Sequence, residues 1–307
     1  MGESIVVVFI SASTRKVLYS MVIDSFERKD ENKNLLNSTS IILDAYKISC
    51  LDMLCWSHPD ADHSRGLGKL IEKYCASSTR ILVPYGFHDP DFRNIRHNKD
   101  DRKFILKLLE TNRPDAYGYS PVSVASGEMS RVDTLRFLTL QHGVGERPFE
   151  ITIDALSPVT GLMSEKIFTN RQIDKNELAI VLAISIGDNR LIFASDILND
   201  EIKYLNFEYL DLPQFVKVPH HGSSSSDKFL HYCSMDKNST VACITSFDRH
   251  GLPEKRVVDE YLYHCGQVDF TGDGHPGVWG EVIYEFDFFG SKSMCTSHKG
   301  NARQLHT

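Results

Sequence analysis

Short apolar runs of strand length recur along both halves of the chain, and this recurrence constrains the fold more than any other feature. The opening runs SIVVVFI and VLYSMVI are joined by a polar turn and predict a β-hairpin. Helical spacing in LLNSTSIILDAYKI and SRGLGKLIEKY separates the later strands of the first half. The second half repeats the strand-rich style in LAIVLAISIG, RLIFASDI, VACITSF and VVDEYLYHCG. We therefore expect an α/β (α+β) protein with two β-sheets flanked by helices.

The composition excludes several functional classes. The 307 residues are 41% hydrophobic and 24% charged, as in an ordinary globular protein, and the net charge of -7 gives no global attraction to nucleic acid or membrane. The seven cysteines are scattered without a Cys-x-x-Cys pair, which argues against a disulfide framework or a zinc knuckle. The chain shows no signal-peptide pattern and no run of membrane-spanning length. We expect a cytoplasmic protein with no membrane partner.

Four residues of metal-ligand type lie within six positions of the stretch WSHPDADHSRGLGKL. They are His58, Asp60, Asp62 and His63, and they directly follow the apolar run LDMLCWS. Imidazoles and carboxylates bind zinc or manganese, and a short turn after a strand can aim several of them at one point. The two pairs could face different sides of the turn and hold two ions. The alternative is that Asp60 or Asp62 caps the following helix while the histidines are exposed.

Two later strand ends carry the same residue types. The run RLIFASDI ends on Asp196, which either binds metal or caps the helix that follows. The run FVKVPHHGSSSS ends on His220 and His221, and the glycine behind them permits close backbone approach to a ligand. The serines that follow are either a linker or hydroxyl and amide donors to a phosphate, with Ser223 and Ser224 as the candidates.

These segments occur in the order of a known family pattern. The segments VID, SHPDADHSRGL, IFASD, VKVPHHGSSSS and ITSFDRHGLP resemble the metallo-β-lactamase fold, and within it the hydrolase domain of ComEC-type DNA-uptake competence proteins and their stand-alone relatives. The resemblance implies a four-layer αββα sandwich with two mixed β-sheets. We expect this domain to cover residues 1–290, with 86–150 as a variable, partly basic insertion. The polar residues 291–307 predict a disordered tail.

The resemblance also implies a role for each of these side chains. His58 and Asp60 would bind a first metal ion, and Asp62 and His63 a second. Asp196 would bridge the two ions, and Asp24 would support the site from behind the ligands. A histidine of the His220–His221 pair would complete the second site, and we favour His221 because it directly precedes a glycine, as in the Gly-His-Gly ending of the fold.

The chain also departs from the family pattern. Position 60 is Asp where many members carry His, and the further histidine expected near DALSP is replaced by Ser157. His142 is the nearby substitute, and without it the first metal site would be weak or empty. Relatives read Gly-His-Pro where this chain carries His250 two positions earlier, and a Gly-His-Pro occurs later at His275.

The ligand set predicts a hydrolase that uses two divalent ions, zinc or manganese, with the oxygen donors favouring manganese. Such ions lower the pKa of a bound water, and the resulting hydroxide attacks phosphorus in line. Asp62, or Asp60 if one ion is absent, could hold the nucleophilic water or take its proton. His250 or His275 could protonate the leaving oxygen or grip a phosphate.

The resemblance implies phosphodiesters as substrates, with DNA or RNA as the leading candidates. Residues 92–107 contain six Lys or Arg and two Asp, and this segment either follows a phosphate backbone or is a solvated helix face. Three alternatives stay open: a small phosphodiester, a carboxylic ester such as a lactone or thioester, and a weakened sensor or assembly subunit. A hydrolase of this type could also act as an effector beside a partner protein, for instance in defence against phage.

Overall fold

The computed structural model describes residues 2–29, 35–85, 121–124, 130–141, 145–169, 173–247, 251–272, 280–287 and 294–306. They form two compact units. Unit 1 comprises Met1–Val124 and Lys166–Ala179, and unit 2 comprises Ala125–Glu165 and Ile180–Thr307. Each unit is built on one mixed β-sheet with helices, so the expected fold class, a mixed α/β protein with two main mixed sheets, is confirmed.

Unit 1 is built on a five-stranded sheet in the order β1-β2-β5-β6-β7. Its strands are β1 (Ile5–Ile10), β2 (Val17–Ile23), β5 (Met53–Cys55), β6 (Arg80–Pro84) and β7 (Pro121–Val124). The first two form the predicted antiparallel hairpin, whereas β2, β5, β6 and β7 pair in parallel. The carboxyl ends of β2 and β5 therefore lie side by side, and the residues that follow these ends can meet at one edge of the sheet.

The helices of unit 1 are short. They are α1 (Ser38–Ala45), α2 (Ala61–Ser64), α3 (Leu67–Tyr74) and the 3₁₀ helix η2 (Lys175–Leu178), and a small sheet pairs β3 (Glu27–Lys29) with β4 (Leu35–Asn37). Helix α3 is amphipathic, because Leu67, Leu70, Ile71 and Tyr74 recur at helical spacing and are all buried. This burial holds α3 in place and fixes the end of the ligand-bearing turn before it.

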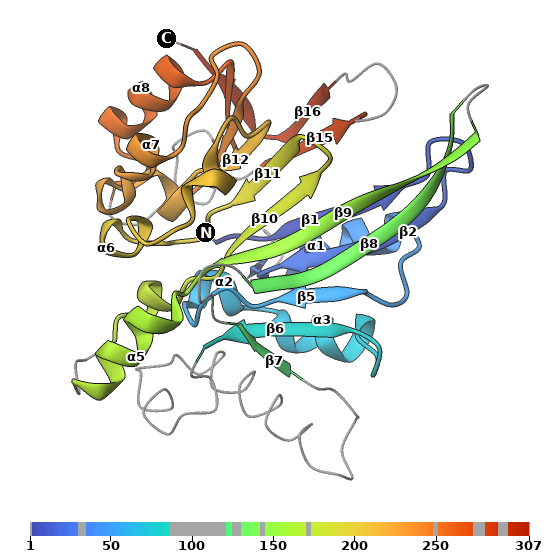
Figure 1. Ribbon diagram of the computed structural model, residues 1–307, viewed down its shortest axis with the longest axis horizontal. Helices are drawn as coiled ribbons and strands as arrows, with labels where there is room; N and C mark the ends of the chain where they lie inside the picture. The colour runs from blue at the N-terminus through green and yellow to red at the C-terminus, as the bar shows by residue number, and fades with distance from the viewer. Residues whose placement is uncertain are drawn as a thin grey trace. The chain divides into compact units, whose positions relative to one another are not determined.

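Unit 2 is built on an eight-stranded sheet in the order β17-β14-β13-β12-β11-β10-β9-β8. Its strands are β8 (Ser130–Gln141), β9 (Gly145–Ser157), β10 (Val181–Ile186), β11 (Asn189–Phe193), β12 (Phe215–Lys217), β13 (Val241–Ile244), β14 (Gln267–Phe270) and β17 (Arg303–Leu305). The strands from β11 to β14 are parallel, and β8 and β9 form a long antiparallel ribbon (Figure 1). The carboxyl ends of β11 and β12 are adjacent, with Phe193 beside Lys217.

Short helices follow several strands of unit 2. They are α6 (Asn199–Ile202), η3 (Phe207–Leu210), η4 (Pro219–Gly222), η5 (Ser224–Ser226) and α7 (Phe229–Tyr232), and α5 (Thr160–Phe168) lies where the chain passes from unit 2 into unit 1. Across the described part of the chain, no helix combines the length and apolar character needed to cross a membrane.

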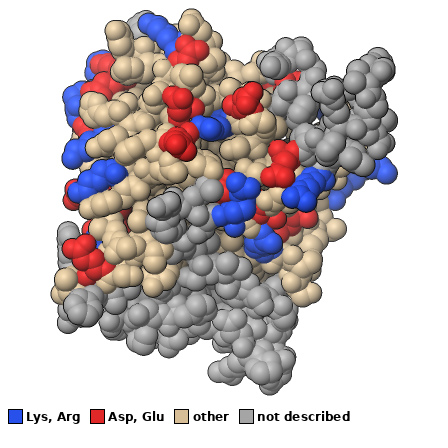
Figure 2. Space-filling model, in the orientation of Figure 1, with Lys and Arg blue, Asp and Glu red and all other residues tan. Residues whose placement is uncertain are grey.

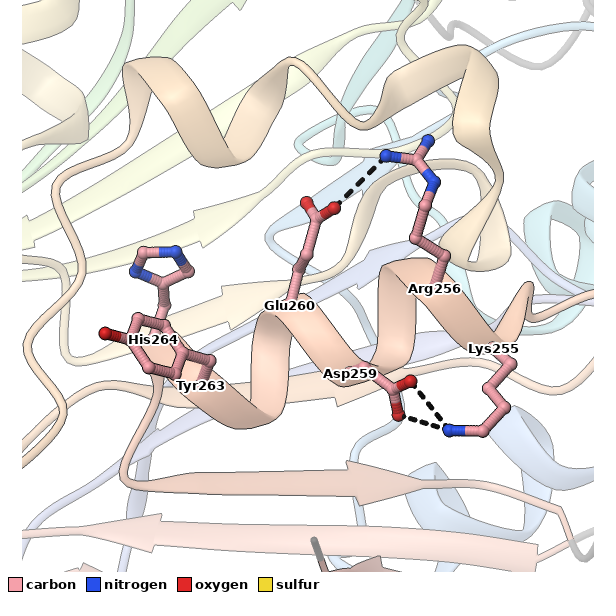
Figure 3. Close-up of a pocket in the computed structure, with 6 residues that line it drawn as sticks. All are labelled: Lys255, Arg256, Asp259, Glu260, Tyr263 and His264. Atoms are coloured by element: carbon pink, nitrogen blue, oxygen red, sulfur yellow. Dashed lines mark hydrogen bonds and ion pairs between the residues drawn. The ribbon is translucent and has the colours of Figure 1, made fainter.

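Helix α8 (Lys255–His264) corrects one prediction, because we expected the run VVDEYLYHCG to be a strand. Val257 and Tyr261 stand four positions apart, lie on one helix face and join a buried cluster with Ile244 and Val268 of the sheet. Figure 3 shows the outer face of the helix, where ion pairs one turn apart join Lys255 to Asp259 and Arg256 to Glu260. The helical period of the buried residues outweighs the strand propensity of the run.

Within residues 86–150, which we expect to be a variable, partly basic insertion, the described residues include β7, β8 and the first part of β9, and the insertion itself stays a prediction. The tail 291–307, which we expected to be disordered, contains β16 (Met294–Gly300) and β17. Strand β16 pairs with β15 (Gly280–Phe286), and β17 extends the main sheet beside β14. Backbone pairing accounts for this order, because the side chains of β16 are mostly exposed.

The buried Asp269 of β14 ties this two-stranded sheet to the main sheet of unit 2. Its carboxylate accepts hydrogen bonds from Tyr284 Oη of β15 at 2.7 Å and Gln267 Nε2 at 2.7 Å, and it contacts His298 Nε2 of β16 at 2.8 Å. A buried carboxylate is tolerated only when such partners replace its hydration. The same burial, with nearby Cys243 and Asp269, raises the pKa of Tyr284, whose hydroxyl stays protonated as a donor.

We expect Asp269→Ala to destabilise unit 2 by about 1–3 kcal/mol, because it leaves the partly buried donors of Tyr284 and Gln267, and His298, without their acceptor. The urea midpoint should fall, and limited proteolysis should cut the β15–β16 segment sooner. Asp188→Ala, which removes an exposed carboxylate from the β10–β11 turn, is the matched control and should change stability by less than about 0.5 kcal/mol. Equal stability of the two variants would contradict this anchoring role.

Candidate metal centre

The carboxylate of Asp24 organises the metal-ligand residues of unit 1. Asp24 follows β2 with a left-handed φ of 58° and is fully buried. Its Oδ1 accepts a hydrogen bond from Ser57 N at 2.7 Å, and its Oδ2 accepts one from Ser57 Oγ at 2.5 Å. Oδ2 also lies 2.8 Å from Nδ1 of His63. Because an ionised carboxylate only accepts, Nδ1 of His63 is the donor, and Nε2 of the neutral ring carries the lone pair that a metal ion needs.

The protonation of His58 follows from the same network. Ser57 Oγ has one proton and donates it to Asp24, and it also lies 3.0 Å from His58 Nδ1. His58 Nδ1 must therefore donate to Ser57, which leaves Nε2 of His58 as the ring nitrogen without a proton. Both rings are fully buried, and their centroids are 4.1 Å apart. The neighbouring imidazoles of His58 and His63 thus both offer Nε2 as the nitrogen that a metal ion could bind.

Each of these histidines has an aspartate in front of its Nε2 atom. His58 Nε2 lies 3.8 Å from Asp60 Oδ2, and His63 Nε2 lies 3.6 Å from Asp62 Oδ2. These separations are too long for a hydrogen bond. Two atoms bound to one tetrahedral ion at about 2.1 Å would be about 3.4 Å apart, so the spacing suits shared coordination.

The turn does not act mainly as a helix cap, which was the alternative from sequence. Asp60 occupies the N-cap position of α2 but makes no side-chain capping hydrogen bond, and the N-cap residue of α3 is Gly66. The Oδ1 atom of Asp60 instead lies 2.7 Å from Nζ of Lys175. This ion pair joins two segments of unit 1 that are far apart in the sequence.

Two further residues of unit 1 bear on the donor set. Sequence reasoning missed Glu3, which is buried, donates its backbone N–H to Asp62 O at 2.8 Å, and has a carboxylate oxygen within 4.8 Å of a ring nitrogen of His63. No motif marks it, so only tertiary contact reveals it. Burial, with the neighbouring Asp24 charge, raises the pKa of Cys55 well above its usual range, so this nearby thiol stays protonated and is a poor ligand.

A second donor cluster lies in unit 2, where β11 and β12 end side by side. Asp196 follows β11, and His220 and His221 follow β12. Ser195, His220 and His221 all have left-handed φ values, of 47°, 48° and 54°. The turned carbonyl of Ser195 accepts hydrogen bonds from His220 N at 2.9 Å and from Lys217 Nζ at 3.3 Å. The left-handed backbone of these three residues thus directs the side chains that follow β11 and β12 toward one another.

Both histidines of this cluster direct Nε2 toward Asp196. His221 Nε2 lies 3.5 Å from Asp196 Oδ2, and His220 Nε2 lies 3.9 Å from the same atom. Nδ1 of His221 contacts the hydroxyl of Thr245 at 2.9 Å and its carbonyl at 3.3 Å, and the ring stacks on Phe247. His221 is buried, whereas the side chain of His220 is 22% exposed, so the buried ring is the better-fixed donor.

Asp196 has a buried cationic neighbour that the sequence did not reveal. Nζ of Lys217 lies 3.6 Å from Asp196 Oδ1, and both side chains are almost completely buried. The alternative role of Asp196 as a helix cap does not hold, because the N-cap residue of α6 is Leu198. The lysine offsets part of the cost of burying this carboxylate.

Of the remaining predicted site residues, the serines make hydrogen bonds within the protein and three histidines lie outside the described residues. Ser157 is buried, and its Oγ accepts a hydrogen bond from Val181 N at 3.0 Å. Ser224 donates through both N and Oγ to Glu254 Oε1, at 2.8 and 2.7 Å, and Ser223 Oγ contacts Ser225 Oγ at 2.9 Å. Three histidines of the prediction, His142, His250 and His275, lie outside the described residues, as does the basic segment 92–107.

The bonds from Ser224 lower the pKa of Glu254, which is therefore ionised at neutral pH. A phosphate bound at Ser224 would have to displace this carboxylate. The expected phosphate contact at Ser223 and Ser224 stays a prediction.

Comparison with known proteins gives a distant likeness. No protein-family model matches the chain, and no curated protein matches it. Among solved structures, the chain is similar to one titled "Crystal Structure of a New Diphosphatase from the PhnP Family", at 12% sequence identity and a TM-score of 0.32, covering 73% of this chain and 67% of that chain. At this TM-score the likeness assigns no activity, so function rests on the side chains.

The two donor clusters fit divalent transition-metal ions. Each presents buried imidazole nitrogens and carboxylate oxygens, which are the ligand types that zinc and manganese take in proteins. In unit 1 the ligands would be His58, Asp60, Asp62 and His63, with Asp24 behind them. In unit 2 they would be Asp196 and His221, with His220 beside them.

We expect Asp24→Asn to weaken metal binding by about 10- to 100-fold, because an amide puts an NH2 donor in place of one accepting oxygen and cannot accept all three hydrogen bonds from Ser57 and His63. Competition with a metal-binding dye would measure the change. Asp52→Asn is the matched control, since Asp52 accepts hydrogen bonds from Ser20 N and Oγ in the same unit and contacts no predicted ligand. If the two variants bind metal equally well, Asp24 does not orient the ligands.

Proposed function

We propose that this chain is a metal-dependent hydrolase that cleaves phosphodiesters. One observation supports it most. Three buried histidines, His58, His63 and His221, each bind a protein oxygen through Nδ1 and place Nε2 between 3.5 and 3.8 Å from an aspartate carboxylate. Metal-binding histidines are typically fixed in this way, whereas core histidines need no facing carboxylates.

The chemistry divides between the metal and the chain. Bound divalent ions lower the pKa of a water molecule toward neutrality and stabilise charge on phosphoryl oxygens. Asp62 would accept the proton of the attacking water, and its side chain is 17% exposed, so water can reach it. Asp24 would hold the imidazole of His63 in place, and Lys217 would hold the carboxylate of Asp196.

The substrate class rests on the motifs SHPDADHSRGL and VKVPHHGSSSS, which resemble those of the hydrolase domain of ComEC-type DNA-uptake competence proteins. DNA or RNA is therefore our leading candidate. On the face shown in Figure 2, Lys and Arg side chains of the described residues are interspersed with Asp and Glu. Nucleic-acid binding would thus depend on a local feature such as residues 92–107.

One observation supports a second candidate, the hydrolysis of a carboxylic ester such as a lactone or thioester. The donors of Ser224, which we expected to bind phosphate, are engaged by the ionised Glu254. A site that lacks this phosphate contact would not require a phosphate group in its substrate. A small phosphodiester, and a weakened subunit that assists a partner protein, complete the alternatives.

We expect the protein, purified with manganese or zinc, to hydrolyse bis-p-nitrophenyl phosphate and to cleave DNA or RNA, with chelation abolishing both. Asp196→Ala should lower the rate by at least about 100-fold, because the site loses a buried carboxylate that would hold the metal ion. Asp200→Ala removes an exposed carboxylate of α6 and should leave the rate unchanged.

Other outcomes of the same assays would redirect the assignment. Hydrolysis of lactones or thioesters without cleavage of phosphodiesters would favour the carboxylic-ester alternative. Metal binding without any hydrolysis would favour an assembly or sensor role. An equal rate for Asp196→Ala and the unchanged chain would attribute the activity to a contaminant.

A further inference from the structure

The ion pair between Lys175 and Asp60 places a positive charge at one end of the proposed metal centre. Nζ of Lys175 lies 2.7 Å from Asp60 Oδ1, and both side chains are partly buried. The other oxygen, Oδ2, faces Nε2 of His58 at 3.8 Å. The ammonium group is therefore bound to the carboxylate that would serve the first metal ion.

Contacts that do not involve Asp60 fix the position of Lys175. Lys175 begins η2, whose N-cap residue Asp174 and third residue Glu177 form a reciprocal capping box. Glu177 also binds Lys166 in a buried ion pair at 3.0 Å, and the buried Leu178 anchors the end of the turn. The lysine thus projects from a rigid turn, and its contact with Asp60 differs from the transient pairing of long surface side chains.

The two ends of the site in unit 1 differ in electrostatic character. At the His63 end, the imidazole donates to the carboxylate of Asp24, and Glu3 lies within 4.8 Å. At the His58 end, the imidazole donates to the neutral hydroxyl of Ser57. Carboxylates raise the basicity of a ligating histidine and attract a cation. A divalent ion is therefore favoured at the His63 end and opposed by the lysine at the His58 end.

We propose that the Lys175 ammonium, in place of a second divalent ion, is the resident positive charge at the His58–Asp60 end, so that unit 1 binds one divalent ion tightly, at the His63–Asp62 end. This inference rests on the proposed metal-dependent function. It also accounts for the missing histidine at Ser157, because a site that holds an ammonium group needs no third imidazole ligand.

Metal stoichiometry tests this proposal without any activity assay. Metal-free protein is loaded with manganese or zinc, desalted and analysed by mass spectrometry, and binding is followed by calorimetric titration. Lys175→Gln, which removes the charge and keeps a polar side chain, should retain one ion more per chain than the unchanged protein, or bind that additional ion at least tenfold more tightly. Lys175→Arg keeps the charge and should retain the same number of ions as the unchanged protein.

Lys69→Gln is the control variant, because Lys69 forms an exposed ion pair with Glu27 in the same unit and should not alter the count. Circular dichroism and the thermal midpoint of each variant show that it is folded. An unaltered ion count and affinity in Lys175→Gln would overturn the proposal while leaving metal-dependent hydrolysis standing. A protein that binds no divalent ion would overturn the proposed function as well.

Discussion

The arrangement of the ligand-type residues in unit 1 depends on the hydrogen bonds of the Asp24 carboxylate. This carboxylate lies at the end of β2 and binds both the backbone and the hydroxyl of Ser57, which follows the parallel strand β5. Through Ser57 it sets the tautomer of His58, and directly it sets that of His63. Burying an isolated carboxylate costs several kcal/mol. The network is stable because its donors replace water, and removing any one of them leaves a buried charge partly unsatisfied.

Backbone strain gathers around the same residues. Seven non-glycine residues in the described part of the chain have positive φ, and four of them are Asp24, Ser195, His220 and His221. Each such conformation costs about 1–3 kcal/mol and persists only where surrounding contacts enforce it. Here those contacts are the hydrogen bonds to Ser57, to the Ser195 carbonyl and to Thr245. Most of the strain is therefore stored where ligand-type side chains must converge at strand ends.

The sequence predicts the parts of this protein that depend on local pattern. The opening hairpin follows from two apolar runs joined by a polar turn. The buried strands and the ligand-type residues after β5, β11 and β12 follow from apolar runs that lead into histidine or aspartate. The prediction of a strand where α8 forms was wrong, because it gave the β-branched residues more weight than the helical spacing of Val257 and Tyr261. The sequence did not predict that β16 and β17 form strands. Backbone pairing stabilises these polar strands, and such pairing leaves little trace in the composition.

The residues that sequence reasoning missed at the site share one property, which is that their partners are set by tertiary structure. Lys175 stands 115 positions from Asp60, and Glu3 belongs to no motif. Lys217 lies inside the run FVKVPHHG but reads there as an ordinary strand residue. Its contact with Asp196 depends on β11 and β12 being parallel neighbours, which no local pattern specifies.

The two lysines also bear on how folding and metal binding are related. Small metal-bound domains often fold only with their ion, because the free energy of binding the ion supplies much of their folding free energy. Here each donor cluster has a lysine beside one of its aspartates, Lys175 beside Asp60 in unit 1 and Lys217 beside Asp196 in unit 2. These ammonium groups neutralise part of the carboxylate charge within each unit before any ion binds. We therefore expect each unit to fold with its histidines already oriented, so that a metal ion would bind ligands that are already in place.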